Sequence, residues 1–324
     1  MKILISGGAG YIGGVLSYYL RDRNINYAVL DNLSTSLKKN VPPNAIFYKG
    51  NIKNISLLKK ILIEFKPTHI IHLAASLDVA ESELNKKKYY INNIVNSKIF
   101  LKFFIKHNVK NFIFASTAAV YRKNSLKKKI ENKHLVPSSY YGKTKLEIEK
   151  YLLSYKNNFN LNIKILRFFN VVGADYKLRS GSLSKKSNQL FNKLCKSIIN
   201  KDKFYIYGNN LRTRDGTCVR DFVDVNDLVK IITFFISYKK SIKFDIFNVG
   251  TNQGHSVLQI LNLFKKNISK DINFYFLDKR KGDAVHSVCN NFRLKKIYKR
   301  KFCSIKKSIY RHYIFYKKNL KIDL

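Results

Sequence analysis

Tyr141 and Lys145 are the residues of this chain best suited to move a proton. On a helix, side chains four residues apart share one face, so the phenol and the ammonium would lie together. A free phenol titrates at about pH 10 and is a poor base at neutrality, but a nearby positive charge favours the phenolate. The spacing therefore suggests Tyr141 as a general base assisted by Lys145, although an exposed helical pair without function would have the same spacing.

Two earlier segments supply what such a base would need. Ser116 and Thr117 precede the pair, and Thr117 could pass the proton or bind the reacting hydroxyl. Residues 7–13 read GGAGYIG, between an apolar run at residues 2–6 and a helical pattern at 11–21. In this strand–loop–helix context Gly7, Gly10 and Gly13 would let the backbone approach a dinucleotide pyrophosphate at the helix N-terminus. A merely flexible turn is the alternative.

Asp31 ends the second predicted strand, residues 27–30, about 20 residues past the glycines, where an acid usually binds the adenosine ribose diol. A carboxylate there would repel a 2′-phosphate, so the sequence favours NAD over NADP. The alternative is an aspartate that only caps the turn at Asn32, Leu33 and Ser34.

Strands and helices alternate along the first half of the chain. Further strands are predicted at residues 45–48, 69–73, 111–115 and 163–166, and helices at 55–65, 88–107 and 138–155. Ser138 and Ser139 are candidate N-caps for the last of these helices. The pattern predicts an α/β fold: a doubly wound, Rossmann-like parallel sheet with a smaller C-terminal substrate lobe. Ligands of such sheets bind at the carboxyl ends of the strands, where the motifs fall.

We expect two lobes, an NAD-binding domain at residues 1–170 and a substrate-binding domain at residues 171–324. Part of 223–250 is expected to return to the first lobe through a strand at 245–249. A basic amphipathic helix is predicted at 304–320. It could lie on a membrane, but packing against the core is the commoner outcome.

Further motifs carry a resemblance to a known family. They lie at residues 72–75, 81–82, 89–93, 137–146, 167–170, 215–222, 248–250 and 280–283. On these motifs the chain resembles the extended short-chain dehydrogenases/reductases, and among them the UDP-glucose 4-epimerases, from residue 5 to about residue 290. Segment 215–222 (DGTCVRDF) is the most discriminating of them.

The resemblance implies that Tyr141 removes the proton of the sugar 4-hydroxyl while C4 passes hydride to bound NAD, and that the 4-keto sugar turns over before hydride returns. It implies that UDP-glucose and UDP-galactose are interconverted. Implied cofactor-binding residues are Gly7, Gly10, Tyr11, Ile12, Gly13, Asp31, Asn32, Ser34, Asn51, Ile52, Leu73, Ala74, Ala75, Asn93, Ser116, Tyr141, Lys145 and Phe169. Implied substrate-binding residues are Thr117, Tyr141, Asn170, Gln189, Leu190, Tyr205, Tyr207, Arg220, Arg280, Asp283 and Ser287.

The chemistry of these residues agrees in part with the resemblance. Arg220 and Arg280 can bind a diphosphate through bidentate charged hydrogen bonds. Tyr205 and Tyr207 would lie on one face of a short strand and could flank uracil. By resemblance Ser287 faces the 2-substituent of the sugar, and a small residue there also admits N-acetylated sugars. We therefore expect UDP-N-acetylglucosamine and UDP-N-acetylgalactosamine to be substrates as well.

Some positions depart from the family pattern. Asn51 replaces the usual aspartate near adenine, and its side-chain carbonyl can still accept a hydrogen bond. Ala118 and Ala119 stand where the related 4,6-dehydratases carry an acid/base pair, so dehydration lacks its catalyst. Another NAD-dependent sugar-nucleotide epimerase, or a dehydrogenase that releases NADH, stays open because it would share Tyr141 and Lys145.

The charge is the most unusual feature of the composition. The chain has 62 Lys and Arg against 20 Asp and Glu, a formal net charge of +42. Such an excess often indicates nucleic acid or an anionic membrane. These basic residues are scattered and no nucleic-acid-binding motif accompanies them, so mutational drift in an AT-rich genome explains them better than a polyanion-binding role. We expect no specific nucleic acid and no membrane among the partners.

Four cysteines, Cys195, Cys218, Cys289 and Cys303, show no metal-binding spacing. This favours a reduced, cytoplasmic protein without a bound metal. The N-terminus enters the first strand at once, so no signal peptide is expected. By resemblance, we expect a homodimer formed through the helices near 88–107 and 138–155.

Overall fold

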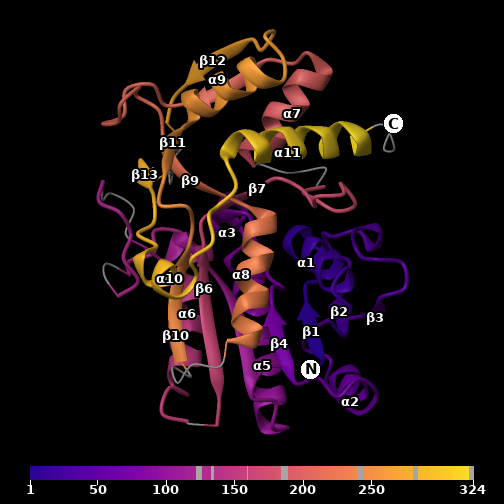
Figure 1. Ribbon diagram of the computed structural model, residues 1–324. Coiled ribbons are helices and arrows are strands. Elements are labelled where there is room, and N and C mark those ends of the chain that lie inside the picture. Colours follow the sequence, from indigo (N-terminus) through magenta and orange to yellow (C-terminus); the bar gives the residue numbers. More distant parts are fainter. Residues whose placement is uncertain are drawn as a thin grey trace.

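A seven-stranded parallel sheet forms the larger part of the protein (Figure 1). The structure is a computed structural model that describes residues 1–121, 126–132, 135–158, 160–183, 189–238, 244–279 and 284–320. The strand order in this sheet is β10-β6-β5-β4-β1-β2-β3. The strands are β1 (Ile3–Ser6), β2 (Tyr27–Asp31), β3 (Ile46–Lys49), β4 (His69–His72), β5 (Asn111–Thr117), β6 (Asn162–Phe168) and β10 (Phe244–Val249).

Helices cover both faces of the sheet, because each parallel crossover must pass over one of them. The larger of these helices are α1 (Tyr11–Arg21), α2 (Ile55–Glu64), α5 (Asn96–Lys106), α6 (Tyr140–Leu153) and α8 (Val225–Ser237). Helices α1 and α8 pack on one face, and α2, α5 and α6 pack on the other. This confirms the predicted α/β fold with a doubly wound sheet.

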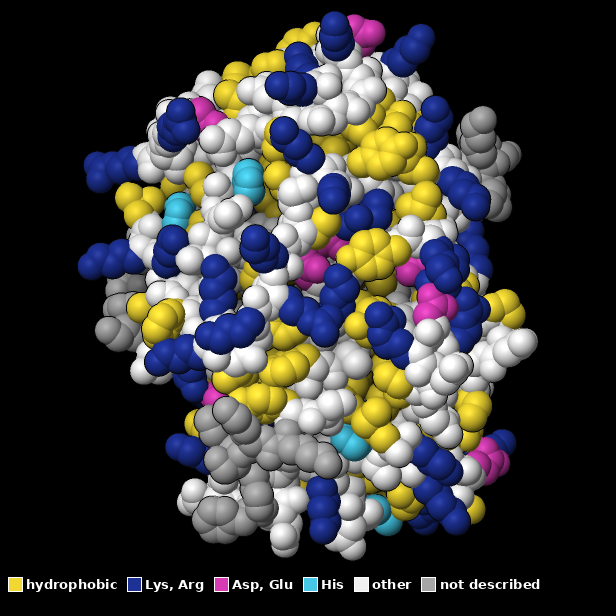
Figure 2. All heavy atoms as spheres, viewed as in Figure 1, with side chains coloured by type: hydrophobic (Ala, Val, Ile, Leu, Met, Phe, Trp, Pro, Cys, Tyr) yellow, Lys and Arg dark blue, Asp and Glu magenta, His cyan; other side chains and the backbone are white. Residues whose placement is uncertain are grey.

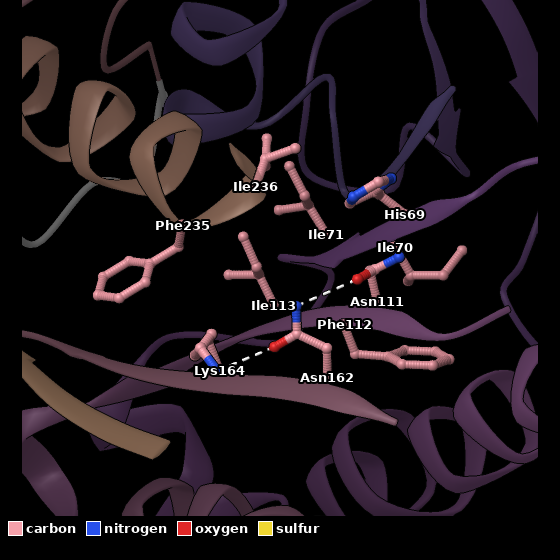
Figure 3. A pocket seen from close by; sticks show the side chains of 10 residues that line it. All are labelled: His69, Ile70, Ile71, Asn111, Phe112, Ile113, Asn162, Lys164, Phe235 and Ile236. Carbon is pink, nitrogen blue, oxygen red and sulfur yellow. Dashed lines mark hydrogen bonds between the residues drawn. The ribbon is translucent and has the colours of Figure 1, made fainter. Parts of the chain in front are cut away.

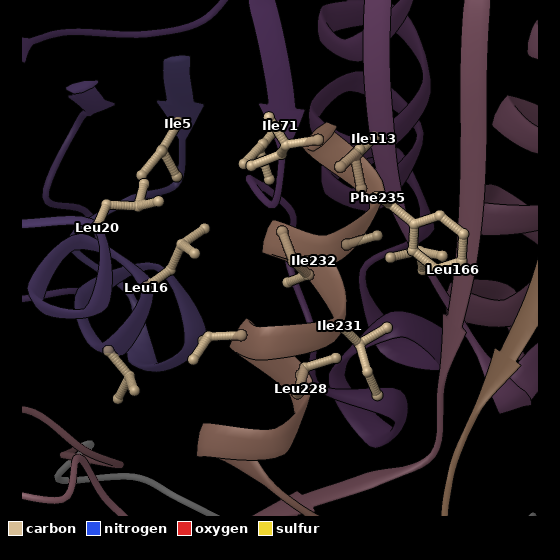
Figure 4. Packing of buried hydrophobic residues seen from close by; sticks show 14 of the residues in the cluster. Ile5, Leu16, Leu20, Ile71, Ile113, Leu166, Leu228, Ile231, Ile232 and Phe235 are labelled. Atoms are coloured by element: carbon tan, nitrogen blue, oxygen red, sulfur yellow. The ribbon is translucent and has the colours of Figure 1, made fainter. Parts of the chain in front are cut away.

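Figure 4 shows how α1 and α8 bury their apolar stripes against the sheet. Leu16 and Leu20 of α1 meet Ile5 of β1, and Ile232 of α8 meets Ile71 of β4; all five side chains are fully buried. The sheet strands between them are buried on both faces, which is why they read as continuous apolar runs in the sequence.

The predicted strand at 245–249 is present as β10, which pairs in parallel with β6 at the sheet edge. The segment after residue 170 therefore leaves the sheet and comes back to it. Phe235 of α8 contacts Phe247 of β10, with ring centres 4.7 Å apart, and α10 (Phe292–Ile297) packs against β10.

A smaller part of the protein sits above the carboxyl ends of the large sheet (Figure 1). Strand β9 (Val219–Asp224) is its centre and pairs with β7 (Asn170–Val172), β11 (Gly254–Ser256) and β13 (His286–Ser287). Strands β8 (Phe204–Tyr207) and β12 (Phe274–Leu277) form a separate pair. Helices α7 (Leu190–Asn200), α9 (Val257–Asn267) and α11 (Ile305–Leu320) complete its core.

Helix α11 is the predicted C-terminal amphipathic helix, and it packs against α7, α9, β7 and β9. Ile309 is fully buried there, and His312 is 2 % exposed. The stripe predicted for this helix therefore covers the protein core, in agreement with the favoured interpretation. No helix within the described part of the chain is both long and apolar enough to cross a membrane.

One predicted helix, residues 88–107, has an irregular first half. The chain forms α3 (Val79–Leu84), α4 (Lys86–Tyr89) and then a π-helix, Tyr90–Val95, before α5 begins. Two 3₁₀ turns, Lys38–Asn40 and Ala118–Val120, lie elsewhere. Single π-turns within helices are frequent at functional sites, and Asn93 of this one contacts the loop after β4.

A small cavity lies at the amino-terminal ends of the strands, where β4, β5 and β6 begin (Figure 3). Its volume of about 10 Å³ is roughly the space of one water molecule. The side chains around it are His69, Ile70, Ile71, Asn111, Phe112, Ile113, Asn162, Lys164, Phe235 and Ile236. The cavity is at the amino-terminal ends of the strands, so it is not part of the site described next.

Candidate active site

The glycine loop joins β1 to α1 at the carboxyl edge of the sheet. Gly7 has φ +74°, a conformation that favours glycine, and a Cβ at this residue would lie 2.6 Å from the Ala74 nitrogen. A Cβ on Gly13 would lie 2.5 Å from the Gly7 carbonyl oxygen. Gly10 is the N-cap of α1 and leaves the first-turn amides without a side-chain cap. The loop is therefore held tightly, with a helix N-terminus open to an anionic group.

Asp31 lies at the end of β2 and is 7 % exposed. Its carboxylate accepts hydrogen bonds from the Ala9 nitrogen at 3.0 Å, the Leu33 nitrogen at 2.8 Å and the Ser36 hydroxyl at 2.8 Å. The contact with Leu33 is the turn cap that the sequence left as an alternative. The contact with Ala9 ties the end of β2 to the glycine loop, so Asp31 is a structural connection as well as a candidate ribose acceptor.

Tyr141 and Lys145 lie on α6, whose N-cap Ser139 accepts a hydrogen bond from the Gly142 nitrogen at 3.1 Å. Burial raises the pKa of Tyr141 to about 12, opposed by a hydrogen bond between its hydroxyl and that of Thr117. Burial lowers the pKa of Lys145 to about 7, opposed by the nearby Glu149 carboxylate. The site therefore disfavours an isolated charge on either group, and an ammonium beside a phenolate would stabilise both.

Strand β5 contacts Lys145 and carries the hydroxyl groups of Ser116 and Thr117. The Lys145 ammonium donates to the Ala115 carbonyl at 2.9 Å and lies 4.9 Å from the centre of the Phe114 ring. Thr117 faces Tyr141, whereas the Ser116 hydroxyl donates to Glu149 inside the protein. Thr117 is therefore the better placed of the two candidate hydroxyls, because the Ser116 side chain has an internal partner.

Other predicted cofactor residues lie along the carboxyl ends of the strands. Leu73, Ala74 and Ala75 follow β4 and are partly buried. Asn93 holds the adjoining Ser76 backbone by two hydrogen bonds of 2.8 and 3.0 Å.

The remaining residues of this group show local contacts. Tyr11 donates its hydroxyl to the Gly173 carbonyl at 2.7 Å. Asn32 and Asn51 each accept from a backbone nitrogen two residues on, at 3.1 Å. Ser34 is exposed, Ile12 is partly buried, and Ile52 and Phe169 are buried.

The predicted substrate residues come from the smaller part of the protein. In the sheet, Arg220 of β9 is in register with Ser287 of β13 on one side and with His255 of β11 on the other. Residues in register project to one face, so the sheet brings Arg220 and Ser287 together. Asn170, at the start of β7, is exposed.

Tyr205 and Tyr207 alternate with the buried Phe204 and Ile206 along β8, so both tyrosines lie on one face of the strand, as predicted, and this face is turned away from the core. The Gln189 side chain accepts a hydrogen bond from the Ser182 hydroxyl at 3.1 Å, just before α7 starts at Leu190. Arg280 and Asp283 lie outside the described residues.

Two contacts near Tyr141 were missed by the sequence interpretation. The Tyr141 backbone nitrogen donates to the Ser82 hydroxyl at 3.1 Å. Glu149 forms a buried ion pair with Arg167, at 2.6 Å between Oε2 and Nη2. Glu149 could have been found, because it repeats the four-residue spacing of Tyr141 and Lys145. No local pattern predicts the pairing with Arg167.

Similarity to known proteins agrees with this geometry. The model of the NAD dependent epimerase/dehydratase family matches residues 3–250. The UDP-glucose 4-epimerase of Lactobacillus helveticus is 36% identical over 302 residues, which cover 92% of this chain and 91% of that protein.

Two solved structures are also similar. The UDP-glucose 4-epimerase of Bifidobacterium longum, in complex with NAD+ and UDP, has a TM-score of 0.92 and 26% identity, covering 99% of each chain. The UDP-Glc/GlcNAc 4-epimerase of Campylobacter jejuni has a TM-score of 0.82 and 30% identity, covering 98% of this chain and 99% of that one. The predicted resemblance and the predicted cofactor, NAD, are confirmed. The chain is an enzyme of the NAD-dependent epimerase/dehydratase family.

Proposed function

We propose that this enzyme interconverts UDP-glucose and UDP-galactose by transient oxidation at C4 of the sugar. The observation that carries the proposal is the buried Tyr141, hydrogen-bonded to Thr117 at the edge of the sheet where the glycine loop also lies. The similarity to UDP-glucose 4-epimerases over most of the chain supports the choice of substrate.

The residues at the sheet edge fit an NAD molecule. The glycine loop has no room for a Cβ at Gly7 or Gly13, and the first-turn amides of α1 can receive the pyrophosphate. Asp31 would accept hydrogen bonds from the ribose diol. When bound there, NAD would accept a hydride from the sugar and return it, so that no cofactor is consumed.

In this proposal Tyr141 takes the proton of the sugar 4-hydroxyl, directly or through the hydroxyl of Thr117, and later returns it. Lys145 lies one helical turn away and stabilises the phenolate by its positive charge. Both side chains are buried, which keeps water from this proton and would strengthen the attraction between a phenolate and an ammonium.

Binding of the UDP group is assigned to the smaller part of the protein. Arg220 would bind the diphosphate, and Asn170, Gln189, Leu190, Tyr205, Tyr207, Arg280 and Asp283 would complete the pocket. Anchoring at the diphosphate leaves the sugar free to present either face to the cofactor, which a reaction that inverts C4 requires. We likewise retain residues 1–170 as the NAD lobe and 171–324 as the UDP-sugar lobe.

We also propose that UDP-N-acetylglucosamine and UDP-N-acetylgalactosamine are interconverted. Ser287 of β13 is partly buried. It is in register with Arg220 of β9, the residue that would bind the diphosphate. A serine leaves space for the acetamido group, whereas a large side chain there would exclude it by steric clash. The Campylobacter jejuni relative is described as acting on both glucose and N-acetylglucosamine forms.

The test uses purified protein without added cofactor. We expect it to retain NAD and to convert UDP-galactose to UDP-glucose. The conversion is measured by separating the two UDP-sugars. Tyr141→Phe should lower turnover by about 10²–10⁴-fold, the range typical of acid–base groups. Tyr140→Phe, on the neighbouring residue, is the matched control and should stay close to the parent. A Tyr141→Phe rate above a third of the parent rate would contradict the proposed base.

Substrate breadth is tested separately. Ser287→Tyr should abolish turnover of UDP-N-acetylglucosamine and preserve that of UDP-glucose, measured by product analysis for each sugar. If the parent fails to convert the N-acetylated sugar, the role of Ser287 is wrong while the 4-epimerase proposal stands. Release of NADH in a single stoichiometric burst would instead favour the simple dehydrogenase.

We further propose a homodimer in the cytoplasm. Large apolar side chains are exposed around the helices assigned to the interface: Leu84 is 89% exposed, Tyr90 50% and Ile91 40%. Contiguous apolar patches often mark protein contacts, and these three side chains lie close in sequence, at the end of α3 and the start of the π-helix. Sedimentation analysis should give a dimer for the parent and a monomer for Ile91→Glu. The four cysteines are free thiols, as is usual in a reducing compartment.

A further inference from the structure

A buried ion pair lies one helical turn beyond Lys145. Glu149 of α6 and Arg167 of β6 are joined by two hydrogen bonds, 2.9 Å from Nε to Oε1 and 2.6 Å from Nη2 to Oε2. The Arg167 side chain is 0% exposed and that of Glu149 is 4% exposed. Arg167 also donates to the Tyr121 hydroxyl at 2.9 Å, which fixes its remaining nitrogen. The chemistry proposed above uses neither residue.

The Glu149 carboxylate also contacts the strand that carries Thr117. Three successive residues of β5 meet three residues of α6 at the spacing of one helical turn. The Ala115 carbonyl accepts from Lys145, the Ser116 hydroxyl donates to Glu149, and Thr117 shares a hydrogen bond with Tyr141. Glu149 therefore supplies one of the three contacts that hold α6 against β5, on the same helix as Tyr141.

The charged and titratable groups around Lys145 come from several elements. His72 of β4 lies near the Lys145 ammonium. Burial of the imidazole and the positive charge of Lys145 lower the pKa of His72 to about 3, so His72 is neutral. Tyr141 and Glu149 share α6 with Lys145. Arg167 lies beyond Glu149 on β6, and Glu131 lies beyond Arg167, where burial raises the pKa of its carboxyl group. Among these groups, Glu149 supplies the negative charge that acts on Lys145.

We propose that Glu149 is a positioning residue of the site: its buried carboxylate holds α6 against β5 and keeps Lys145 charged, so that Lys145 can stabilise the Tyr141 phenolate. The inference rests on the proposed function, because it uses the roles assigned there to Tyr141 and Lys145. A buried pair that merely cross-links helix and sheet is the competing interpretation.

Glu149→Gln is the informative variant. Glutamine keeps the size of the side chain and one acceptor oxygen but removes the charge, and it leaves Arg167 as an uncompensated cation. Both changes favour the neutral form of Lys145. With its positive neighbour weakened, Tyr141 should ionise at a higher pH, by about one pH unit for the loss of one nearby charge. A purely structural cross-link predicts no such shift.

The first measurement needs no substrate. The ultraviolet absorbance of phenolate is titrated with pH on NAD-loaded protein. Because the chain has 21 tyrosines, the Tyr141 signal is obtained by difference against Tyr141→Phe in the same background. We expect the Tyr141 midpoint to rise in Glu149→Gln and to stay near that of the parent in Glu149→Asp, which restores the charge.

The second measurement is the pH profile of kcat for UDP-galactose. Its acid limb should move to higher pH in Glu149→Gln, so that the rate falls about tenfold on that limb for a one-unit shift and recovers at alkaline pH. Glu147→Gln is the matched control, since Glu147 lies on the same helix with its side chain 43% exposed and paired with Lys98. Its profile should be that of the parent.

Unchanged midpoint and unchanged acid limb in a folded Glu149→Gln protein that retains NAD would overturn the proposal. If this variant does not fold, Glu149→Leu combined with Arg167→Met removes both charges together and leaves none unpaired. The double variant should show an alkaline shift in the same direction, and no shift would again overturn the proposal. Parent protein that cannot convert UDP-galactose would refute the proposed function, while the phenolate titration would still decide the role of Glu149.

Discussion

Replacing Asp31 separates its structural contacts from its predicted contact with the cofactor. The carboxylate accepts three hydrogen bonds, of which the one from Ala9 is buried. Hydrogen bonds to a charged group contribute about 1.5–3 kcal/mol each, but water can replace the partners at Leu33 and Ser36, which are partly exposed. The loss in Asp31→Ala is therefore mainly that of the buried contact with Ala9, and we expect the free energy of unfolding to fall by about 1.5–3 kcal/mol.

Asp31→Asn is the milder change. Its carbonyl oxygen can still accept from Leu33 and Ser36, but its amide group cannot accept from the Ala9 nitrogen. The expected loss is therefore about 1–3 kcal/mol, the cost of one unsatisfied buried donor. Scanning calorimetry of cofactor-free protein measures both variants, and the Tm should fall by roughly 2 °C per kcal/mol.

The same variants test cofactor choice. Loss of the acceptor for the ribose diol should weaken NAD binding by about 10–100-fold, the equivalent of one charged hydrogen bond. NADP binding should weaken less or improve, because the repulsion of its 2′-phosphate is removed. Titration with each cofactor gives the ratio of the two dissociation constants, which should approach one in Asp31→Ala.

Ser36→Ala is the control, because it removes one hydrogen bond to the same carboxylate and leaves the charge in place. It should lower the Tm slightly and leave the NAD to NADP ratio unchanged. If Asp31→Asn lowers the Tm but keeps the parent ratio, the carboxylate only ties the glycine loop to β2, and the predicted ribose contact is refuted.

Three further perturbations follow from single contacts. Gly13→Ala should abolish NAD retention, because its Cβ would lie 2.5 Å from the Gly7 carbonyl oxygen; cofactor released on denaturation is the measure. Asp224→Ala should detach α11, since Asp224 accepts from Ser308 at 2.5 Å and from Arg311 at 2.6 Å, and limited proteolysis within 305–320 would detect this. His72 is neutral in the fold, with a pKa of about 3 against 6.5 ordinarily, so the unfolded chain binds the proton first. The stabilisation by neutral His72 should thus be fully present above about pH 6.5, and the free energy of unfolding should fall by up to about 1.4 kcal/mol per pH unit from there towards pH 3. Urea unfolding at several pH values measures this loss, which should be smaller in His72→Gln.

The positive charge is distributed over the visible face of the protein. Figure 2 shows Lys and Arg side chains spread from one end of this face to the other, with few acidic groups between them. This distribution agrees with the scattered basic residues of the sequence. Mobility-shift assays at physiological salt would test the polyanion-binding alternative, because loose phosphate binding weakens steeply with salt.

The parallel sheet, the glycine loop and the Tyr141–Lys145 pair could be predicted because each depends on neighbours in sequence. Periodicity sets which face of a strand or helix is apolar, and the spacing of four residues places both side chains on one face. The predicted helix at 88–107 was only partly regular, because Asn93 turns inward to bind the loop after β4 and a π-helix accommodates it. Such a contact joins residues 17 apart and has no local signal.

The sequence by itself therefore determined the fold class, the cofactor and the candidate base, all of which follow from local pattern and side-chain chemistry. Only the tertiary structure decided that Ser116 faces Glu149 while Thr117 faces Tyr141, since the packing of α6 on β5 brings together residues that are distant in sequence. It also decided that Arg220 lies beside Ser287, because strand register is set by packing between segments distant in sequence. Burial within the assembled sheet, which no short stretch of sequence reveals, is what raises the pKa of Tyr141 and lowers that of Lys145.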